Sequence, residues 1–156
     1  MARLPDFPQA GGCVCGAVRY ELTAPPLGAY RCHCKDCQRF SSGGYGLSMP
    51  VERANFRQTE GETVCYDKPA DSGRTVRMHA CPKCGTKLWN EPAYSATMLI
   101  LKPGTLDDAS WVRPTGNIWT ASAVDWAIDP AELSFPQQPP SREPLFAAWA
   151  AQFEDA

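Results

Sequence analysis

Three cysteines stand within six residues of this sequence, at Cys32, Cys34 and Cys37. Thiolate sulfur is a soft ligand that binds Zn²⁺ at about 2.3 Å, and such short spacings let one tight turn direct several sulfurs at a single ion. Four protein ligands close a structural zinc site, whereas three leave a position for water or substrate. The occupant of the fourth position therefore decides whether this site is structural or catalytic.

Two further pairs of cysteines predict a second metal site. Cys81 and Cys84 are separated by two residues and followed by a glycine, which permits a tight turn, and this pattern is typical of a zinc knuckle. Cys13 and Cys15 form the other pair, and a β structure can bring both pairs together. The apparent binding energy of a structural zinc, about 10–16 kcal/mol, is comparable with the net stability of a whole domain. A Cys₄ site would therefore tie the first strand to the middle of the chain.

The eight cysteines predict zinc in preference to disulfides or an iron–sulfur cluster. The N-terminus has no secretion signal, the cytosol keeps thiols reduced, and cysteines separated by one residue seldom form an unstrained disulfide. Cys65 lies in an alternating segment, where we expect a small buried apolar side chain. Alternatively, Cys65, His33 or His79 completes the three-cysteine site. His33 stands between two ligand cysteines, so we expect its side chain to point away from their metal.

Charge and hydropathy indicate the kind of partner. The 156 residues carry 15 Lys and Arg against 17 Asp and Glu, with no block of like charge, so we expect neither nucleic acid nor a membrane surface as partner. The longest clearly apolar run, residues 98–101, is far shorter than the roughly 20 residues that span a bilayer. The sequence therefore predicts a single cytoplasmic domain, residues 1–156, that acts on a small molecule.

The elements that position these cysteines are mostly strands, so the predicted fold is mainly β. Alternating apolar residues predict strands over residues 18–22, 45–49 and 75–79. Residues 97–101 are continuously apolar, which predicts a strand covered on both faces. The stretch 118–128 also has a β-like pattern.

Two connections and one helix complete the prediction. Gly61 separates two segments, 56–59 and 62–67, which we expect to pair as a hairpin. Residues 130–140 are rich in proline and predict an irregular segment. The C-terminal extension changes to helical spacing, which predicts a helix over about 141–154, with Ser141 as its cap. Acidic residues 154 and 155 oppose the helix dipole, so we expect that end to fray.

The order of the cysteine motifs resembles a known family. The sequence reads GGCVCGAVRY at 11–20, CHCKDCQR at 32–39 and HACPKCGTKL at 79–88, followed by GTLDD at 104–108. Over roughly residues 10–130 it resembles the glutathione-dependent formaldehyde-activating enzyme family, which includes centromere protein V-like members. The resemblance implies a β-rich, tent-like fold of small antiparallel sheets with two zinc ions.

The resemblance also implies a role for each cluster. The residues that match the family's structural zinc site are Cys13, Cys15, Cys81 and Cys84. Those that match its catalytic, three-thiolate zinc site are Cys32, Cys34 and Cys37. The implied activity is that of a carbon–sulfur lyase, which joins glutathione and formaldehyde to S-(hydroxymethyl)glutathione or reverses that reaction.

The chemistry of a three-thiolate zinc suits this activity. Three thiolates leave the site with a formal charge of −1, so the ion is a weak Lewis acid but a good site for an incoming thiol. A thiol in the open position would lose its proton and stay nucleophilic at neutral pH. Arg31, Lys35 and Arg39 surround the loop and either meet the carboxylates of glutathione or are ordinary surface charges.

Two other functions fit the same cysteines. A zinc-stabilised binding or scaffold module would use both metals structurally and would need a fourth protein ligand at the second site. A different thiol–aldehyde lyase would keep the open zinc and change the substrate pocket. The coordination of the second zinc separates the module from the enzymes.

Overall fold

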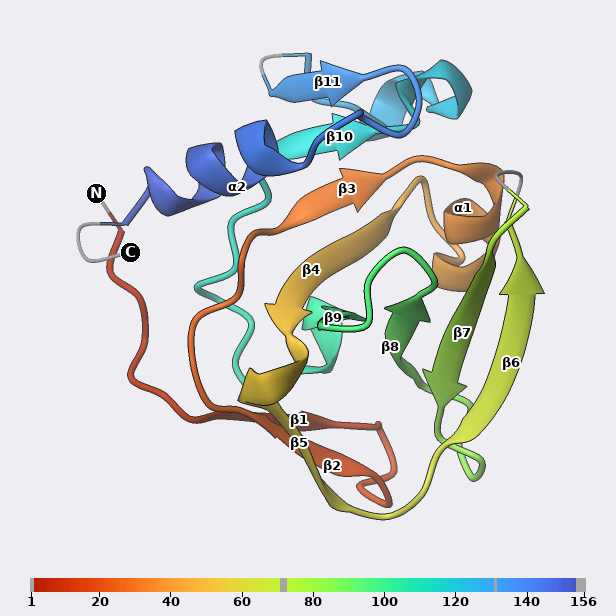
Figure 1. Cartoon of the computed structure of the whole chain (residues 1–156), viewed down its shortest axis with the longest axis vertical. Coiled ribbons are helices and arrows are strands. Elements are labelled where there is room, and N and C mark those ends of the chain that lie inside the picture. The colour runs from red at the N-terminus through yellow and green to blue at the C-terminus, as the bar shows by residue number, and fades with distance from the viewer. Residues whose placement is uncertain (1, 71–72, 131, 154–156) are drawn as a thin grey trace.

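The structure is a computed structural model that describes residues 2–70, 73–130 and 132–153 (Figure 1). Two β-sheets make up most of it, and they are accompanied by the short helix α1 (Lys35–Ser41) and the C-terminal helix α2 (Glu143–Ala150). The mainly β fold with a C-terminal helix, predicted from the sequence, is confirmed. Within the described residues, no helix is long and apolar enough to cross a membrane.

The larger sheet has eight strands and curves around the molecule (Figure 1). Its strands, in spatial order, are β11 (Leu133–Phe135), β10 (Gly116–Ile118), β3 (Tyr30–Cys32), β4 (Gly46–Glu52), β9 (Met98–Leu101), β8 (Lys87–Pro92), β7 (Thr75–Ala80) and β6 (Val64–Pro69). The smaller sheet has the order β1 (Gln9–Gly12), β2 (Arg19–Leu22), β5 (Phe56–Glu60).

Pairing is antiparallel in both sheets except at β10, which runs parallel to β3 and to β11. Parallel neighbours need a crossover connection of about a dozen residues or more, and residues 119–132 supply one between β10 and β11. The expectation of antiparallel pairing throughout is therefore wrong for this strand.

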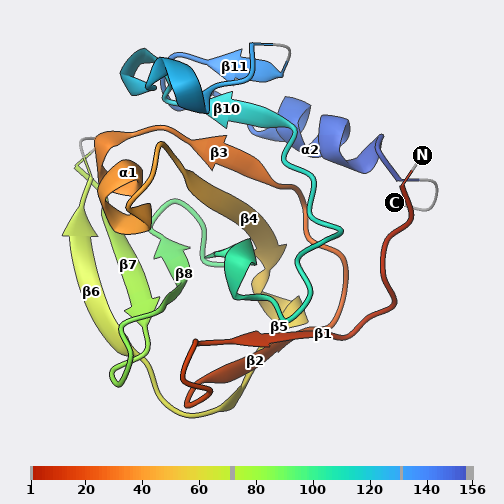
Figure 2. The ribbon, with the colours of Figure 1, turned by 180° about the vertical axis from the view of Figure 1, so that it is seen from behind.

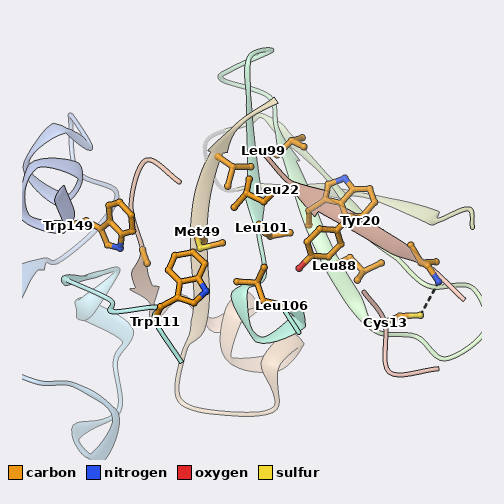
Figure 3. Close-up of a cluster of buried hydrophobic side chains, with 14 of the residues drawn as sticks. Cys13, Tyr20, Leu22, Met49, Leu88, Leu99, Leu101, Leu106, Trp111 and Trp149 are labelled. Carbon is orange, nitrogen blue, oxygen red and sulfur yellow. Dashed lines mark hydrogen bonds between the residues drawn. The ribbon is translucent and has the colours of Figure 1, made fainter. Parts of the chain in front are cut away.

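The main core lies between the two sheets. Tyr20 and Leu22 of β2 point toward Met49 of β4 and toward Leu99 and Leu101 of β9 (Figure 3). All five side chains are buried, with at most 1% of their surface exposed. The alternation predicted for 18–22 is thus confirmed, and burying such side chains contributes roughly 1.5–3 kcal/mol each.

The C-terminal helix packs through its predicted apolar face. Leu145 and Trp149 of α2 are buried, and Phe153 forms a parallel bridge with Ala2 near the start of the chain. The cap predicted at Ser141 is wrong by one residue, because the N-cap is Arg142; the Ser141 hydroxyl still accepts a hydrogen bond from the amide of Glu143 at 3.1 Å. The helix ends earlier than predicted, at Ala150, and the fraying expected at residues 154 and 155 falls outside the described residues.

The hairpin predicted around Gly61 is wrong. Strand β5 pairs with β2 in the smaller sheet, and β6 pairs with β7 in the larger one. Phe56 of β5 packs against Tyr20 and Trp89, with ring centroids 5.3 and 4.8 Å apart, and this aromatic contact holds β5 away from β6. Gly61 instead turns the chain from one sheet to the other, with a φ of +72°.

Two other segments also differ from the prediction. The β-like stretch 118–128 contributes only the end of β10, and it then forms two 3₁₀ turns, Thr120–Ser122 and Asp125–Ala127. Trp126, which dominates the apolar pattern there, is 77% exposed and packs into no core. The supposedly irregular segment 130–140 contains β11, which pairs with β10. Local pattern failed in 130–140 because β11 lies at the edge of the sheet and is fixed by its pairing with β10.

Substituting Gly61 tests its place between the sheets. A Cβ at Gly61 would lie 2.0 Å from the carbonyl oxygen of Ala17, whereas one at Gly73, whose φ is +78°, would meet nothing within 4 Å. The left-handed backbone alone costs a non-glycine residue roughly 1–2 kcal/mol. We expect Gly61→Ala to lower the free energy of unfolding by at least about 2 kcal/mol more than Gly73→Ala does. Urea unfolding measures both, and equal losses would contradict this packing.

Candidate metal centres

The structure brings Cys13, Cys15, Cys81 and Cys84 together, with all four sulfurs within 4.8 Å of one another. The sulfur of Cys15 lies 3.5 Å from that of Cys13 and 3.8 Å from that of Cys81. Four sulfurs held tetrahedrally at about 2.3 Å from a zinc ion stand about 3.8 Å apart. The donor set and its spacing therefore fit Zn²⁺.

The local backbone explains why these motifs end in glycine. Gly16 and Gly85 have φ values of +78° and +77°, which side chains with a Cβ rarely adopt. Their amides donate to the carbonyls of Cys13 and Cys81 at 3.0 and 2.9 Å. Each motif thus folds into a tight turn that directs its two sulfurs at one point.

Thr86 links the two cysteine pairs. Its hydroxyl oxygen accepts a hydrogen bond from the amide of Val14 at 3.2 Å, so the hydroxyl proton is available to Cys84, whose sulfur lies 3.2 Å away. This hydrogen bond, together with backbone hydrogen bonds from Thr86 and Cys15 and a side-chain bond from Cys15, favours the thiolate and lowers the pKa of Cys84 to about 5. A ready thiolate is what a metal requires of a cysteine ligand.

The second cluster consists of Cys32, Cys34 and Cys37, whose sulfurs also lie within 4.8 Å of one another. Cys32 ends β3, and Cys34 caps α1, accepting a hydrogen bond from the amide of Cys37 at 3.3 Å. Helix α1 lies beside the end of β3 and packs against the start of β4 (Figure 2). Hydrogen bonds from the thiols of Cys32 and Cys34 lower the pKa of Cys37. Three convergent sulfurs of this kind also fit zinc.

Polar side chains fix the loop that carries this cluster. Gln38 donates from its amide to the carbonyls of His33 and Ser122, at 2.7 and 2.8 Å. The hydroxyl of Ser122 donates to the same His33 carbonyl at 2.9 Å. The fully buried ring of His33 is hydrogen bonded to Asn117 at 2.8 Å, away from the three sulfurs, as the sequence predicts.

Of the residues that the structure describes, no fourth cysteine, histidine or carboxylate joins this cluster. Cys65 and His79 instead contact each other across β6 and β7, with sulfur and Nδ1 3.5 Å apart. His79 also pairs with Glu91, at 2.9 Å. Cys65 is exposed, so the expectation that it is buried is wrong. The reason is its place on β6, the edge strand of the larger sheet.

A pocket of about 340 Å³ adjoins the second cluster. Helix α1 contributes Cys37 and Phe40 to its wall, and β4 contributes Leu47. Lys87 at the start of β8 and Lys102 just after β9 also line it. Two larger hollows, of about 540 Å³ each, contain no cysteine. Of these three, the pocket at Cys37 is the one beside cysteine sulfur.

The sequence does not single out either lysine; it offers three other cations near the loop, either as carboxylate ligands or as ordinary surface charges. Arg31 forms an ion pair with Glu132, and Lys35 is exposed and reaches only Gln38. Arg39 is exposed as well, and none of the three lines the pocket. Lys87 and Lys102 were not predictable because they meet only through the pairing of β8 with β9.

Comparison with known proteins identifies the family. The family model described as glutathione-dependent formaldehyde-activating enzyme matches residues 8–122, which is most of the chain and includes all seven cysteines of the two clusters. The chain belongs to this family. The match also contains the pocket, because Lys87 and Lys102 lie inside it.

Two individual proteins resemble this member of the formaldehyde-activating family. A Halomonas elongata protein named "Putative glutathione-dependent formaldehyde-activating enzyme" is 29% identical over 83 residues, which are 51% of this chain and 53% of that protein. The chain thus matches about half the length of this curated relative. A crystal structure of a Rhodobacter sphaeroides protein aligns with 81% of this chain and 98% of its own, at 17% identity and a TM-score of 0.52, and so shares the fold.

Metal analysis tests the two clusters of this family member. Protein purified without chelator should contain two zinc ions per chain. Cys84→Ser should leave the chain unfolded or insoluble, because a structural site is worth about as much as a domain's net stability. Cys34→Ser should lose one zinc and stay folded. A stoichiometry of one in the wild type, or a Cys84→Ser protein with unchanged melting temperature, would contradict the assignment.

Thr86→Val tests the hydrogen bond to Cys84. Without it the thiol pKa rises, so protons displace the metal at a higher pH. We expect the midpoint of zinc release on acidification to move to higher pH, measured with a chromogenic chelator. Thr59→Val, on the exposed surface of β5, should leave the midpoint unchanged, and an unmoved midpoint in Thr86→Val would exclude the role.

Proposed function

We propose that this protein is a zinc-dependent carbon–sulfur lyase that joins glutathione and formaldehyde to S-(hydroxymethyl)glutathione and catalyses the reverse reaction. Family membership supports the substrates. In this proposal Cys13, Cys15, Cys81 and Cys84 hold a structural zinc, and Cys32, Cys34 and Cys37 hold a catalytic one. The observation that carries it is the three-sulfur cluster, which has no fourth ligand among the described residues and adjoins a pocket.

Cys37 connects the metal cluster with the pocket, because it belongs to both. A group held beside its sulfur therefore faces the apolar surfaces of Phe40 and Leu47, which line the same pocket. Zinc bound there would supply a deprotonated substrate thiol at neutral pH. The loop hydrogen bonds of Gln38 keep Cys34 and Cys37 in position for this.

The reaction itself needs little else. The sulfur of glutathione adds to the carbonyl carbon of formaldehyde, a carbon–sulfur bond forms, and the carbonyl π electrons move to oxygen. That oxygen gains the proton that the thiol has lost, so the product is a hydroxymethyl thioether. The reverse reaction breaks the same bond. Because thiols add to formaldehyde unaided, the lack of a conspicuous general base is consistent with this chemistry.

The rival binding module receives less support. It requires a fourth protein ligand at the second cluster, and the candidates Cys65 and His79 contact each other instead. A lyase that uses another aldehyde would retain the cluster and the pocket, and it differs from our proposal only in the electrophile. We further propose a cytoplasmic location, because all eight cysteines are unpaired, the state that a reducing compartment maintains.

Cys34→Ser should abolish catalysed turnover while leaving the fold in place, since the four-sulfur site still joins the sheets. Exchange NMR between free and hydroxymethylated glutathione separates the catalysed rate from the uncatalysed one. We expect the catalysed rate to fall to the background level.

Cys65→Ser is the matched control, since it removes one exposed thiol outside both clusters. It should retain two zinc ions and full activity. If it released a zinc instead, Cys65 would be the fourth ligand, and the protein would be a binding module. Full activity in Cys34→Ser would equally exclude the lyase.

A further inference from the structure

Two lysines share the wall of the pocket beside Cys37. Lys102 follows β9, and its backbone amide donates to the carbonyl of Leu88 at 2.9 Å. Because Leu88 is the residue after Lys87, this hydrogen bond brings the two lysines close together. The ammonium group of Lys87 lies 4.2 Å from the centre of the Phe40 ring. The ammonium group of Lys102 reaches the carbonyl of Leu47 at 3.5 Å. Two positive charges therefore converge on one half-buried hollow.

Neither ammonium group has a carboxylate partner among the described residues. The contrast with other half-buried cations is clear, because Arg19, Arg31 and Lys68 each form an ion pair with an acid. Burying two like charges without an anion is unfavourable. Burial and the neighbouring charge of Lys102 together lower the pKa of Lys87 to about 7. A site that tolerates this cost is built to receive an anion.

The negative charge of the cysteine cluster does not balance the charge of the two lysines. Thiolates at Cys32, Cys34 and Cys37 favour the charged form of Lys87, but burial and Lys102 outweigh them. Three thiolates around one Zn²⁺ would carry a net charge of −1, against the two positive charges of the lysines. The pocket is therefore left with excess positive charge beside the proposed position of the substrate thiol.

We propose that Lys87 and Lys102 bind a carboxylate of the thiol substrate and so select thiols that carry an anionic group over neutral thiols. This inference rests on the proposed function, because it concerns the same pocket. The pocket suits such a ligand: Phe40, Leu47 and Pro103 contact its apolar part, while the lysines take its charged end. A carboxylate between two ammonium groups accepts charge-assisted hydrogen bonds, which are about twice as strong as neutral ones.

Calorimetric titration of the zinc-loaded protein tests the proposal with matched ligands. Glutathione and its diethyl ester have the same thiol, but the ester lacks both negative charges. S-methylglutathione keeps the carboxylates and lacks the thiol. We expect the wild type to bind glutathione at least about tenfold more tightly than the ester. Lys87→Met and Lys102→Met should each weaken glutathione binding about tenfold and leave ester binding nearly unchanged.

Lys35→Met is the control variant, because Lys35 is a cation on the cluster loop that lies outside the pocket. It should leave the binding of all three ligands unchanged. Zinc content and melting temperature establish that each variant is folded, and Lys102→Gln replaces Lys102→Met if the latter fails this check. Conservative Lys102→Arg should recover most of the preference for glutathione.

Three outcomes would overturn the proposal: equal affinity of the wild type for glutathione and its ester, equal weakening of both ligands by the lysine variants, or equal weakening by Lys35→Met. The second would mean that the lysines only offset the charge of the thiolates. Binding of S-methylglutathione that depends on the lysines separates this inference from the proposed function, because it needs neither the thiol nor turnover. A protein that shows it without catalysis would refute the lyase and retain the anion site.

Discussion

The convergence of four sulfurs from two distant turns is the constraint on which the rest of this structure depends. Cys13 and Cys15 lie in the turn between β1 and β2 of the smaller sheet, and Cys81 and Cys84 lie in the turn between β7 and β8 of the larger one. Closing so long a stretch of chain costs conformational entropy, and the zinc that we propose at this junction would offset that cost. The buried side chains around Tyr20 then fill the space between the two sheets.

This junction explains why the second cluster can be open. Because Cys32, Cys34 and Cys37 are close in sequence, they bring no distant elements together, and the fold does not depend on their metal. Hydrogen bonds of Gln38, Ser122 and Asn117 hold the loop instead. A metal at this cluster would therefore have one coordination position left for a substrate, as we propose, whereas the four cysteines that join the sheets would fill all four positions.

Those features that depend on local sequence were predictable. The turn of a cysteine pair followed by glycine, the alternation of Tyr20 and Leu22, and the apolar face of α2 are each written into a few consecutive residues, and the structure contains all three. The division of seven cysteines into a group of four and a group of three was also predictable. One pair supplies only two of the four ligands of a zinc site, so each pair needs the other. Cys32, Cys34 and Cys37 are close enough in sequence to converge on one point.

The remaining features depend on contacts between distant segments. The segments before and after Gly61 do not pair with each other. Phe56, in the first segment, packs against Tyr20 and Trp89, and nothing near Gly61 in the sequence indicates these contacts. The parallel pairing of β10 with β3 was not predictable for the same reason, because the two strands are far apart in the sequence.

The pocket is the clearest example of information that only the fold supplies. Near the cysteine loop, the sequence offers Arg31, Lys35 and Arg39 as cations for an anionic substrate, but the fold pairs Arg31 with Glu132 and leaves the other two on the surface. The lysines at the pocket follow the second cysteine pair and β9, at positions 87 and 102, and nothing in their spacing indicates that they meet. Their effect depends on burial, because a charge is strongly felt only where water is excluded. In our proposal, specificity is therefore set by residues that the strands of the larger sheet bring to Cys37, whereas the two cysteine clusters could be predicted from spacing alone.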